Sequence, residues 1–213
     1  MRLSYLVRQL WLGLTARSSM DYWERRYRAG LTSGSGSYGD LAAFKAEFLN
    51  EFVHAHSIQS VVEFGCGDGG QLALASYPRY LGLDVSPTAI DLCSSRFRDD
   101  RTKSFLLYDS ERTINLGNFV NGDLTLSLDV IYHLLEEQVY RRYLSNLFVS
   151  SRRFVIVYSS NRESRTVARH VRERQFTADV QREIPEFRLI RTVPNRYPEM
   201  SISQFFVFER ICG

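Results

Sequence analysis

The sequence has 213 residues, of which 44% are hydrophobic and 24% are charged. This length predicts one domain with a sizeable core, and the composition excludes a disordered, collagen-like or coiled-coil chain. The 27 basic and 24 acidic residues leave a net charge of +3. A nucleic-acid surface contacts many phosphates through basic side chains, so this small excess argues against a nucleic-acid partner.

The cysteines and the N-terminal segment bear on the compartment of the protein and on its relation to membranes. Cys66, Cys93 and Cys212 are widely spaced and form neither a disulfide framework nor a paired zinc motif, which predicts a reducing, cytoplasmic setting. Apolar residues recur at helical spacing over residues 3–14, a segment too short to cross a bilayer, so we expect no membrane span. This helix would pack on the domain, on a second subunit of a homo-oligomer or, as the less favoured reading, on a membrane surface.

The strongest break in the chain is a glycine- and serine-rich stretch. Residues 33–39 read Ser-Gly-Ser-Gly-Ser-Tyr-Gly and predict a mobile loop. Residues 41–56 then predict an amphipathic helix with Lys45 on its polar side. We therefore divide the single domain into residues 1–40, with N-terminal helices and the loop, and residues 41–213.

Strands and helices alternate through the rest of the chain. Apolar runs predict strands at residues 61–64, 80–83, 104–108, 124–128 and 154–158, and the clearest helices between them are residues 88–97 and 136–148. This alternation predicts a doubly wound α/β fold, in which helices cover both faces of a mostly parallel sheet. Two further strands, at residues 187–193 and 204–210, predict an antiparallel addition at the end, which makes seven strands.

A glycine-rich turn stands where the first predicted strand ends, in the sequence Glu63-Phe64-Gly65-Cys66-Gly67-Asp68-Gly69. Glycines there tolerate positive φ angles and let the backbone approach a ligand closely, although a tight structural turn has the same composition. Asp84 ends the second strand, where an acidic side chain can accept hydrogen bonds from two ribose hydroxyls. The combination predicts a nucleoside site.

Acidic residues also follow the third and fourth predicted strands, at Asp109 and Asp129. Because parallel strands end at one edge of a sheet, these side chains would converge on the crevice where open α/β sheets bind ligands. Each of them alone would more often be a helix cap or a turn residue. Together they strengthen the nucleoside prediction, and Asp109 could meet an adenine amino group.

These motifs, with Gly82-Leu83-Asp84-Val85-Ser86 and Ser127-Leu128-Asp129-Val130, resemble the class I S-adenosylmethionine-dependent methyltransferases over roughly residues 21–210. The resemblance implies a seven-stranded Rossmann-like sheet and S-adenosylmethionine as cofactor. It implies that the glycine turn lines the amino-acid part of the cofactor, that Glu63 orders this turn, and that Asp84 and Asp109 face the ribose and the adenine. The implied cofactor-binding residues of the core are Glu63, Gly65, Cys66, Gly67, Asp84, Val85, Asp109, Ser110 and Leu128.

An aromatic motif, Tyr22-Trp23-Glu24-Arg25-Arg26-Tyr27, precedes this core. It resembles the Tyr-Trp start of several small-molecule branches of the same family. The resemblance implies that Tyr22 and Arg26 close over the cofactor, with Arg26 pairing with its carboxylate. A helix that merely packs through its aromatic residues is the alternative.

Methyl transfer to a hydroxyl needs an aligned acceptor and a group that takes its proton. His133 follows the fourth strand, and the pKa of an unperturbed histidine suits a general base at neutral pH. We predict His133 as the base, with Asp129 orienting it. His133 could instead cap or pack the next helix, or share a divalent metal such as Mg²⁺ with Asp129, although two ligands do not establish a metal.

A basic segment follows the fifth strand and contains Arg165, Arg169, His170, Arg172 and Arg174. One interpretation gives it no functional role, as a solvated basic helix whose charge is balanced by glutamates. The functional interpretation is that His170 and Arg172, together with Tyr132, bind a polar or anionic acceptor, with His170 as a reserve base.

A narrower resemblance concerns the loop at residues 33–39, the glycine turn and His170-Val171-Arg172-Glu173-Arg174. These segments are similar to methyltransferases found with polysaccharide-building enzymes, which implies a saccharide hydroxyl as acceptor and the loop as a lid over the cofactor. The sequence thus predicts an S-adenosylmethionine-dependent O-methyltransferase of a carbohydrate or other small polar acceptor. The alternative is a non-catalytic S-adenosylmethionine-binding regulatory or assembly module. A nucleic-acid methyltransferase ranks lower, because no Asn/Asp-Pro-Pro-Tyr/Phe motif follows the fourth strand.

Overall fold

A computed structural model of the protein describes residues 15–112, 119–164 and 170–211. The helix predicted over residues 3–14 lies outside the described residues, and so do Arg165 and Arg169 of the basic segment. Within the described ranges, no helix has the length and apolar character that crossing a membrane requires.

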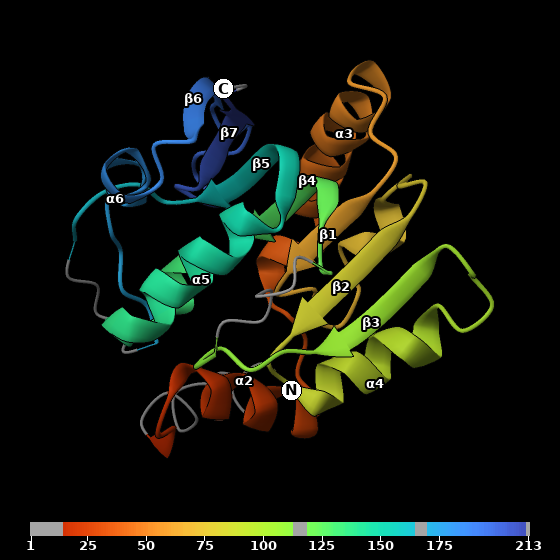
Figure 1. The fold of residues 1–213 in the computed structure, drawn as a ribbon. Coiled ribbons are helices and arrows are strands. Elements are labelled where there is room, and N and C mark those ends of the chain that lie inside the picture. The colour runs from red at the N-terminus through yellow and green to blue at the C-terminus, as the bar shows by residue number, and fades with distance from the viewer. Residues whose placement is uncertain (1–14, 113–118, 165–169, 212–213) are drawn as a thin grey trace.

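The core of the fold is a seven-stranded sheet in the order β3-β2-β1-β4-β5-β7-β6 (Figure 1). Strands β1 to β5 are mutually parallel, and β7 runs antiparallel to both β5 and β6. The predicted mixed sheet with an antiparallel C-terminal addition is therefore confirmed. The strands are β1 (Val61–Phe64), β2 (Tyr80–Asp84), β3 (Lys103–Leu107), β4 (Gly122–Leu128), β5 (Ser151–Ser159), β6 (Phe187–Val193) and β7 (Gln204–Arg210).

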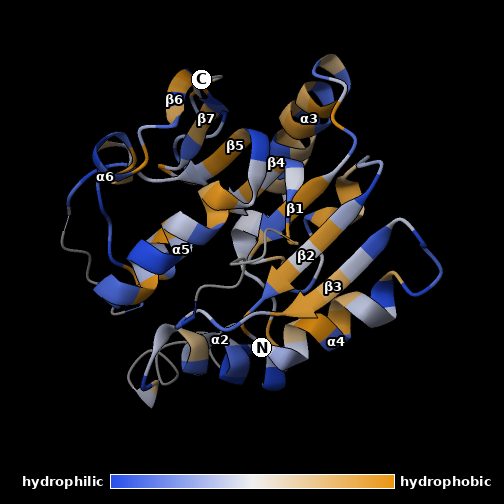
Figure 2. Ribbon diagram, viewed as in Figure 1, coloured by the Kyte–Doolittle hydropathy of each residue, from blue (hydrophilic) through white to orange (hydrophobic). Residues whose placement is uncertain are grey.

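Helices cover both faces of the sheet because its central strands are apolar on both sides. Val61 packs into the cluster of buried side chains that includes residues of α3 and α4, whereas Val62 packs into the cluster that includes residues of α5 and α6. Figure 2 shows the resulting apolar strands between helices that carry polar residues outward. The helices are α2 (Ser19–Arg28), α3 (Gly39–Ala55), α4 (Pro87–Arg96), α5 (Glu137–Val149) and α6 (Phe176–Glu183).

Helix α2 lies across the edge of the sheet to which the arrowheads of β2 and β3 point (Figure 1). Its first turn is capped by Ser18, whose Oγ accepts a hydrogen bond from the Asp21 backbone N–H at 3.1 Å. Helix α6 is the element that the sequence did not reveal. Its eight residues bury only Phe176 and Val180, so its apolar pattern is too short to be read as periodic.

Candidate active site

A cavity of about 840 Å³ lies at the carboxyl end of β1, β2 and β4. Such a place is where open α/β sheets bind ligands. Of the residues predicted from the sequence, those that line this cavity are Glu63, Gly65, Cys66, Gly67, Asp84, Val85, Ser110, Leu128, Asp129 and His133. Their convergence is what the four strand ends predict, and their individual roles stay predictions.

The glycine turn after β1 has no room for side chains. Gly65 and Gly67 have φ angles of 87° and 59°. A Cβ at Gly65 would lie 2.5 Å from Val130 Cγ2, and one at Gly67 would lie 2.4 Å from Ser33 Oγ. The turn therefore presents bare backbone to the cavity, as a close contact with a ligand requires.

Asp84 is buried at the end of β2 and holds the glycine turn in place. Its Oδ2 accepts a hydrogen bond from the Gly67 backbone N–H at 2.9 Å, and its Oδ1 accepts one from the Ser86 N–H at 2.9 Å. Each carboxylate oxygen can accept a second hydrogen bond, which leaves capacity for two hydroxyls. Burial raises the pKa of Asp84 to about 6, so the group is ionised at neutral pH.

A second buried carboxylate, Glu63 on β1, also lines the cavity. It accepts a hydrogen bond of 2.6 Å from the Tyr80 hydroxyl. Burial raises the pKa of Glu63 to about 7, although this hydrogen bond and the charge of Lys45 oppose the rise. Glu63 therefore connects β1 to Tyr80 of β2, two residues before the glycine turn begins.

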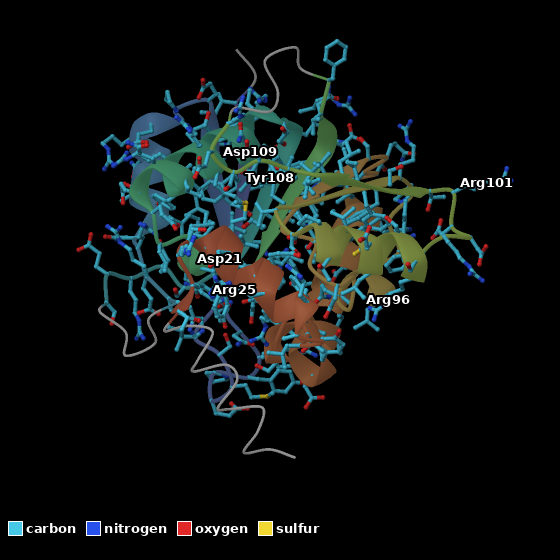
Figure 3. All side chains as sticks on the ribbon, turned by 90° about the horizontal axis from the view of Figure 1, so that it is seen from below. Asp21, Arg25, Arg96, Arg101, Tyr108 and Asp109 are labelled. Carbon is cyan, nitrogen blue, oxygen red and sulfur yellow. The ribbon has the colours of Figure 1, made fainter. Side chains whose placement is uncertain are left out.

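Asp109 does not line the cavity, contrary to the expected position beside an adenine. Its side chain is 52% exposed and accepts a hydrogen bond from Arg112 Nε at 3.0 Å and from the Glu111 backbone N–H. The neighbouring Tyr108 and Ser110 line the cavity instead (Figure 3 labels Tyr108 and Asp109). Asp109 lies in an irregular segment after β3, where its carboxylate accepts a hydrogen bond from a backbone N–H two residues further on and points away from the cavity.

Helix α2 closes the cavity from outside and is fixed at two points. Glu24 accepts hydrogen bonds from Ser86 Oγ at 2.7 Å and from Thr88 Oγ1 at 2.9 Å, both at the start of α4. Near the other end, Ser19 donates through its backbone N–H and its Oγ to the Glu136 carboxylate that precedes α5. Figure 3, which views this edge of the sheet, shows Asp21 and Arg25 on the same helix.

Only part of the aromatic motif lines the cavity. Trp23 and Tyr27 line it, whereas Tyr22 and Arg26 are buried outside the lining. Arg26 Nε donates to the Thr32 carbonyl at 2.6 Å, so the guanidinium holds the turn after α2. The expected pairing of Arg26 with a cofactor carboxylate has no support in this position.

The glycine- and serine-rich loop is tethered to the glycine turn. Asp68 Oδ2 accepts hydrogen bonds from the Ser33 backbone N–H at 2.9 Å and from the Tyr38 hydroxyl at 2.8 Å. The backbone of this loop also lies against Asp129, because a Cβ at Gly36 would come within 2.7 Å of Asp129 Oδ2. The loop therefore covers the end of the cavity formed by β4.

Asp129 does not orient His133, and this expectation is corrected. Its Oδ2 lies 2.6 Å from Lys45 Nζ, and its Oδ1 accepts a hydrogen bond from the Tyr132 hydroxyl at 2.9 Å. Asp129 adopts a φ of 59°, which is uncommon for a residue other than glycine. Lys45 is only 1% exposed, although the helical pattern placed it on the polar side of α3. A buried carboxylate partner, invisible in the sequence, explains the burial of this lysine.

His133 is oriented by a backbone group. Its Nδ1 lies 3.0 Å from the carbonyl oxygen of His170, and a carbonyl oxygen can only accept a hydrogen bond. Nδ1 therefore carries the hydrogen in the neutral ring, and Nε2 keeps a lone pair. Burial lowers the pKa of His133 to about 4, so the ring is neutral at physiological pH. The His170 ring lies between the rings of Tyr22 and His133, stacked on both.

Arg172 and Arg174, the arginines of the basic segment that the structure describes, contact the protein backbone. Arg172 Nη1 donates to the Leu135 carbonyl at 3.1 Å, and Arg174 Nη1 donates to the Leu134 carbonyl at 2.6 Å. Both guanidinium groups also pair with Glu137. Tyr132, His170 and Arg172 are likewise absent from the lining of this cavity.

The residues present do not fit a divalent metal. Among the described residues, no group of three or more histidine, cysteine, aspartate or glutamate side chains is placed to hold a metal ion. Of the two ligands considered from the sequence, Asp129 is already paired with Lys45. We therefore derive no chemical step through a metal.

Similarity to known proteins is found in both sequence and fold. No family model matches the sequence. A curated relative, the small RNA 2'-O-methyltransferase of Arabidopsis thaliana, is 26% identical over an alignment of 160 residues that covers 70% of this chain. The match covers only 17% of that much longer protein.

Solved structures of methyltransferases share the fold. The methyltransferase domain of bacterial CtHen1 superposes with a TM-score of 0.65 at 21% identity, covering 81% of this chain and all of that domain. Magnesium protoporphyrin IX methyltransferase from Synechocystis PCC 6803, solved with S-adenosylhomocysteine, gives 0.64 at 17% identity over 90% of this chain and 98% of its own. N-methyltransferase NodS from Bradyrhizobium japonicum WM9, also solved with S-adenosylhomocysteine, superposes with a TM-score of 0.61 at 18% identity. The superposition covers 79% of this chain and 85% of NodS.

Two of these names state an acceptor, small RNA and magnesium protoporphyrin IX, and none of the names supports the narrower resemblance to polysaccharide-associated enzymes. What the solved structures share with this chain is the fold of the methyltransferase domain. The chain therefore has the fold of the class I, seven-stranded methyltransferases.

Proposed function

We propose that the protein transfers a methyl group from S-adenosylmethionine to a hydroxyl of an uncharged acceptor, such as a carbohydrate or another small polar molecule. The observation that carries this proposal is the neutral His133 in the lining of the same cavity as Asp84 and the glycine turn. One end of the cavity thus suits a nucleoside, and the other end offers a proton acceptor.

The cofactor end is supported by chemistry that this chain supplies. Ionised Asp84 would accept hydrogen bonds from the two ribose hydroxyls while it holds the Gly67 backbone. The bare backbone of the glycine turn would lie against the amino-acid part. Lys45, which lines the cavity with its ammonium group beside Asp129, is better placed than Arg26 to meet a carboxylate.

The acceptor end is supported by the tautomer of His133. When bound, S-adenosylmethionine supplies a methyl group on a positively charged sulfur, which is a good leaving group. The acceptor oxygen forms a bond to the methyl carbon as the carbon–sulfur bond breaks, and His133 Nε2 takes the hydroxyl proton. The His170 carbonyl stabilises the protonated ring through Nδ1–H, and helix α2 keeps water from the reacting atoms.

A second candidate acceptor is a ribose hydroxyl of RNA. The similarity to a small RNA 2'-O-methyltransferase favours it, because that enzyme also methylates a sugar hydroxyl. The small net charge of the chain argues against extensive contact with phosphates.

Transfer of a labelled methyl group to a panel of sugars, glycosides, phenols, amines and short RNAs tests the proposal, with and without a chelator. We expect label on a neutral hydroxyl compound, no effect of the chelator, and loss of at least about 100-fold in kcat for His133→Ala, a size typical of a general base. His54→Ala is the control, because His54 is exposed on α3 and outside the cavity lining.

Three outcomes would contradict the proposal. Label that appears only on amines would exclude a hydroxyl acceptor. Turnover that His133→Ala leaves unchanged would remove this residue from the base role. Cofactor binding that Asp84→Ala abolishes, without transfer to any acceptor, would favour the non-catalytic binding module.

A further inference from the structure

A second cavity, of about 620 Å³, opens beside the first one. It lies where β5 ends and where the chain passes from β6 to β7. Its lining includes Tyr132, Ser160, Val171, Glu199, Met200 and Ile202. None of the residues that the proposed reaction uses lines it, so this cavity has no role in the function as proposed above.

The hydrogen-bonded side chains of Tyr132 and Asp129 connect the two cavities. Tyr132 lines the second cavity, and its hydroxyl donates to Asp129 Oδ1, whose carboxylate lines the first. His133, the next residue along the chain, lines the first cavity. Val171 lines the second and directly follows His170, whose carbonyl orients His133. A molecule in the second cavity would therefore lie close to the proposed base.

Ser160 shows that the second cavity is suited to a hydrogen-bonding ligand. The residue is 4% exposed, and its Oγ is buried without a hydrogen-bond partner. A buried hydroxyl without a partner destabilises a folded protein, so such groups are few and call for an explanation. A hydroxyl or carbonyl of a ligand in this cavity would supply the missing partner.

The charges around the cavity exclude an anion as the preferred ligand. No lysine or arginine is among the described residues that line it. The nearby arginines of the basic segment donate to carbonyls of residues 134 and 135. Glu173, a lining carboxylate, is paired with Arg162 at 3.0 Å, and Glu199 is exposed.

The remaining walls are apolar or hydroxylic. Met200 and Ile202 are each 51% exposed, and they provide an apolar wall beside the ring of Tyr132. Ser201 and Ser203 add hydroxyl groups to the same lining. Apolar surface combined with hydroxyls and carboxylate oxygens suits a ring that has an apolar face and several hydroxyls.

We propose that this second cavity binds an uncharged, hydroxyl-bearing ring of the acceptor, such as a pyranose, next to the hydroxyl that is methylated. The inference rests on the proposed function and names where the acceptor is recognised. Binding in the second cavity would also explain how an uncharged acceptor is held. Its second ring would make contacts there, in addition to those of the methylated ring in the first cavity.

Methionine methyl signals test the proposal in the full chain. The sequence has three methionines, of which Met20 lines the first cavity and Met200 the second. In protein labelled at its methionine methyl groups, we expect S-adenosylhomocysteine to shift the Met20 signal. With that ligand bound, a panel of neutral methyl glycosides should shift the Met200 signal saturably, and a glucose phosphate or glucosamine should bind more weakly.

Two serine variants provide a matched comparison. Ser160→Ala removes the unpartnered hydroxyl of the lining, whereas Ser159→Ala removes an equally buried, unpartnered hydroxyl outside it. We expect Ser160→Ala to raise the half-saturation concentration for the glycosides roughly three- to tenfold, the effect of about one hydrogen bond. Ser159→Ala should leave it unchanged, and neither variant should lower Tm.

The inference is overturned if no neutral glycoside moves the Met200 signal, if the charged sugars bind more tightly, or if the two serine variants behave alike. Failure of the proposed function has a different signature. In that case S-adenosylhomocysteine leaves the Met20 signal unmoved, or methyl transfer is absent although Met200 responds to glycosides.

Discussion

Removing Lys45 should leave a buried charge without its partner. The ion pair between Lys45 and Asp129 has exposed side-chain fractions of only 1% and 16%. Loss of one partner of a buried pair costs roughly 3–5 kcal/mol. Asp129 keeps the hydrogen bond from Tyr132 and some contact with water, so we expect Lys45→Met to lower the free energy of unfolding by about 3 kcal/mol.

Urea denaturation at neutral pH measures this loss, with a second substitution and a control. Asp129→Asn in the Lys45→Met background removes the unpaired charge, and asparagine tolerates the positive φ at this position. We expect the double variant to be more stable than Lys45→Met alone. Lys103→Met is the control, because its partner Asp100 is 38% exposed and such surface pairs contribute at most about 1 kcal/mol. Equal losses at Lys45 and Lys103, or a double variant no better than the single one, would refute the reasoning.

Three other predictions concern pH and the closing helix. Glu63 and Asp84 bind protons more tightly in the folded chain than in the unfolded one, so their contribution to stability falls as pH rises from about 4 to 7, and the urea midpoint of Glu63→Gln relative to that of the unsubstituted chain should rise over this range. Because burial lowers the pKa of His133 to about 4, the kcat profile should show no His133 ionisation near pH 6.5; an inflection there that disappears in His133→Ala would contradict the burial argument. Glu24→Gln should loosen α2 from the start of α4, which should raise the KM for S-adenosylmethionine several-fold and make proteolysis of α2 faster. Asp21→Asn is the control, because the Asp21 side chain pairs with Arg25 on the same helix, and it should change neither quantity.

The sheet could be predicted because its information is local. Each strand is a short apolar run, and the turn residues between the runs mark where it ends; β1, for example, begins at Val61 and ends at Phe64 as its pattern indicates. Repeated alternation with helices then fixes the topology, because parallel strands need crossover connections. Helix α6 could not be predicted in this way, because its two buried residues are too few to show a helical periodicity.

The site could be predicted where the backbone positions the side chain, and not where the partner is distant in sequence. Asp84 ends a strand, so its place at the sheet edge follows from β2 itself. The partners of Asp129 include Lys45, 84 positions away, and the His133 ring is oriented by a carbonyl 37 positions away. Neither contact leaves a pattern in one sequence, and Asp109 points away from the cavity because its carboxylate accepts a backbone hydrogen bond within an irregular segment.

Several features that destabilise the free chain gather at one edge of the sheet. Asp84 and Glu63 are buried carboxylates with raised pKa values, Asp129 has a positive φ, and Ser160 has a buried hydroxyl without a partner. A ligand that supplies hydroxyl donors to Asp84 and a hydrogen-bond partner to Ser160 would offset part of this cost, so it would bind the folded chain in preference to the unfolded one. Such strain is typical of places where surrounding structure holds a site ready for its ligands. Under the proposed function, the two cavities would form one recognition surface, in which the cofactor would meet Asp84 in the first and the acceptor would meet the Ser160 hydroxyl in the second.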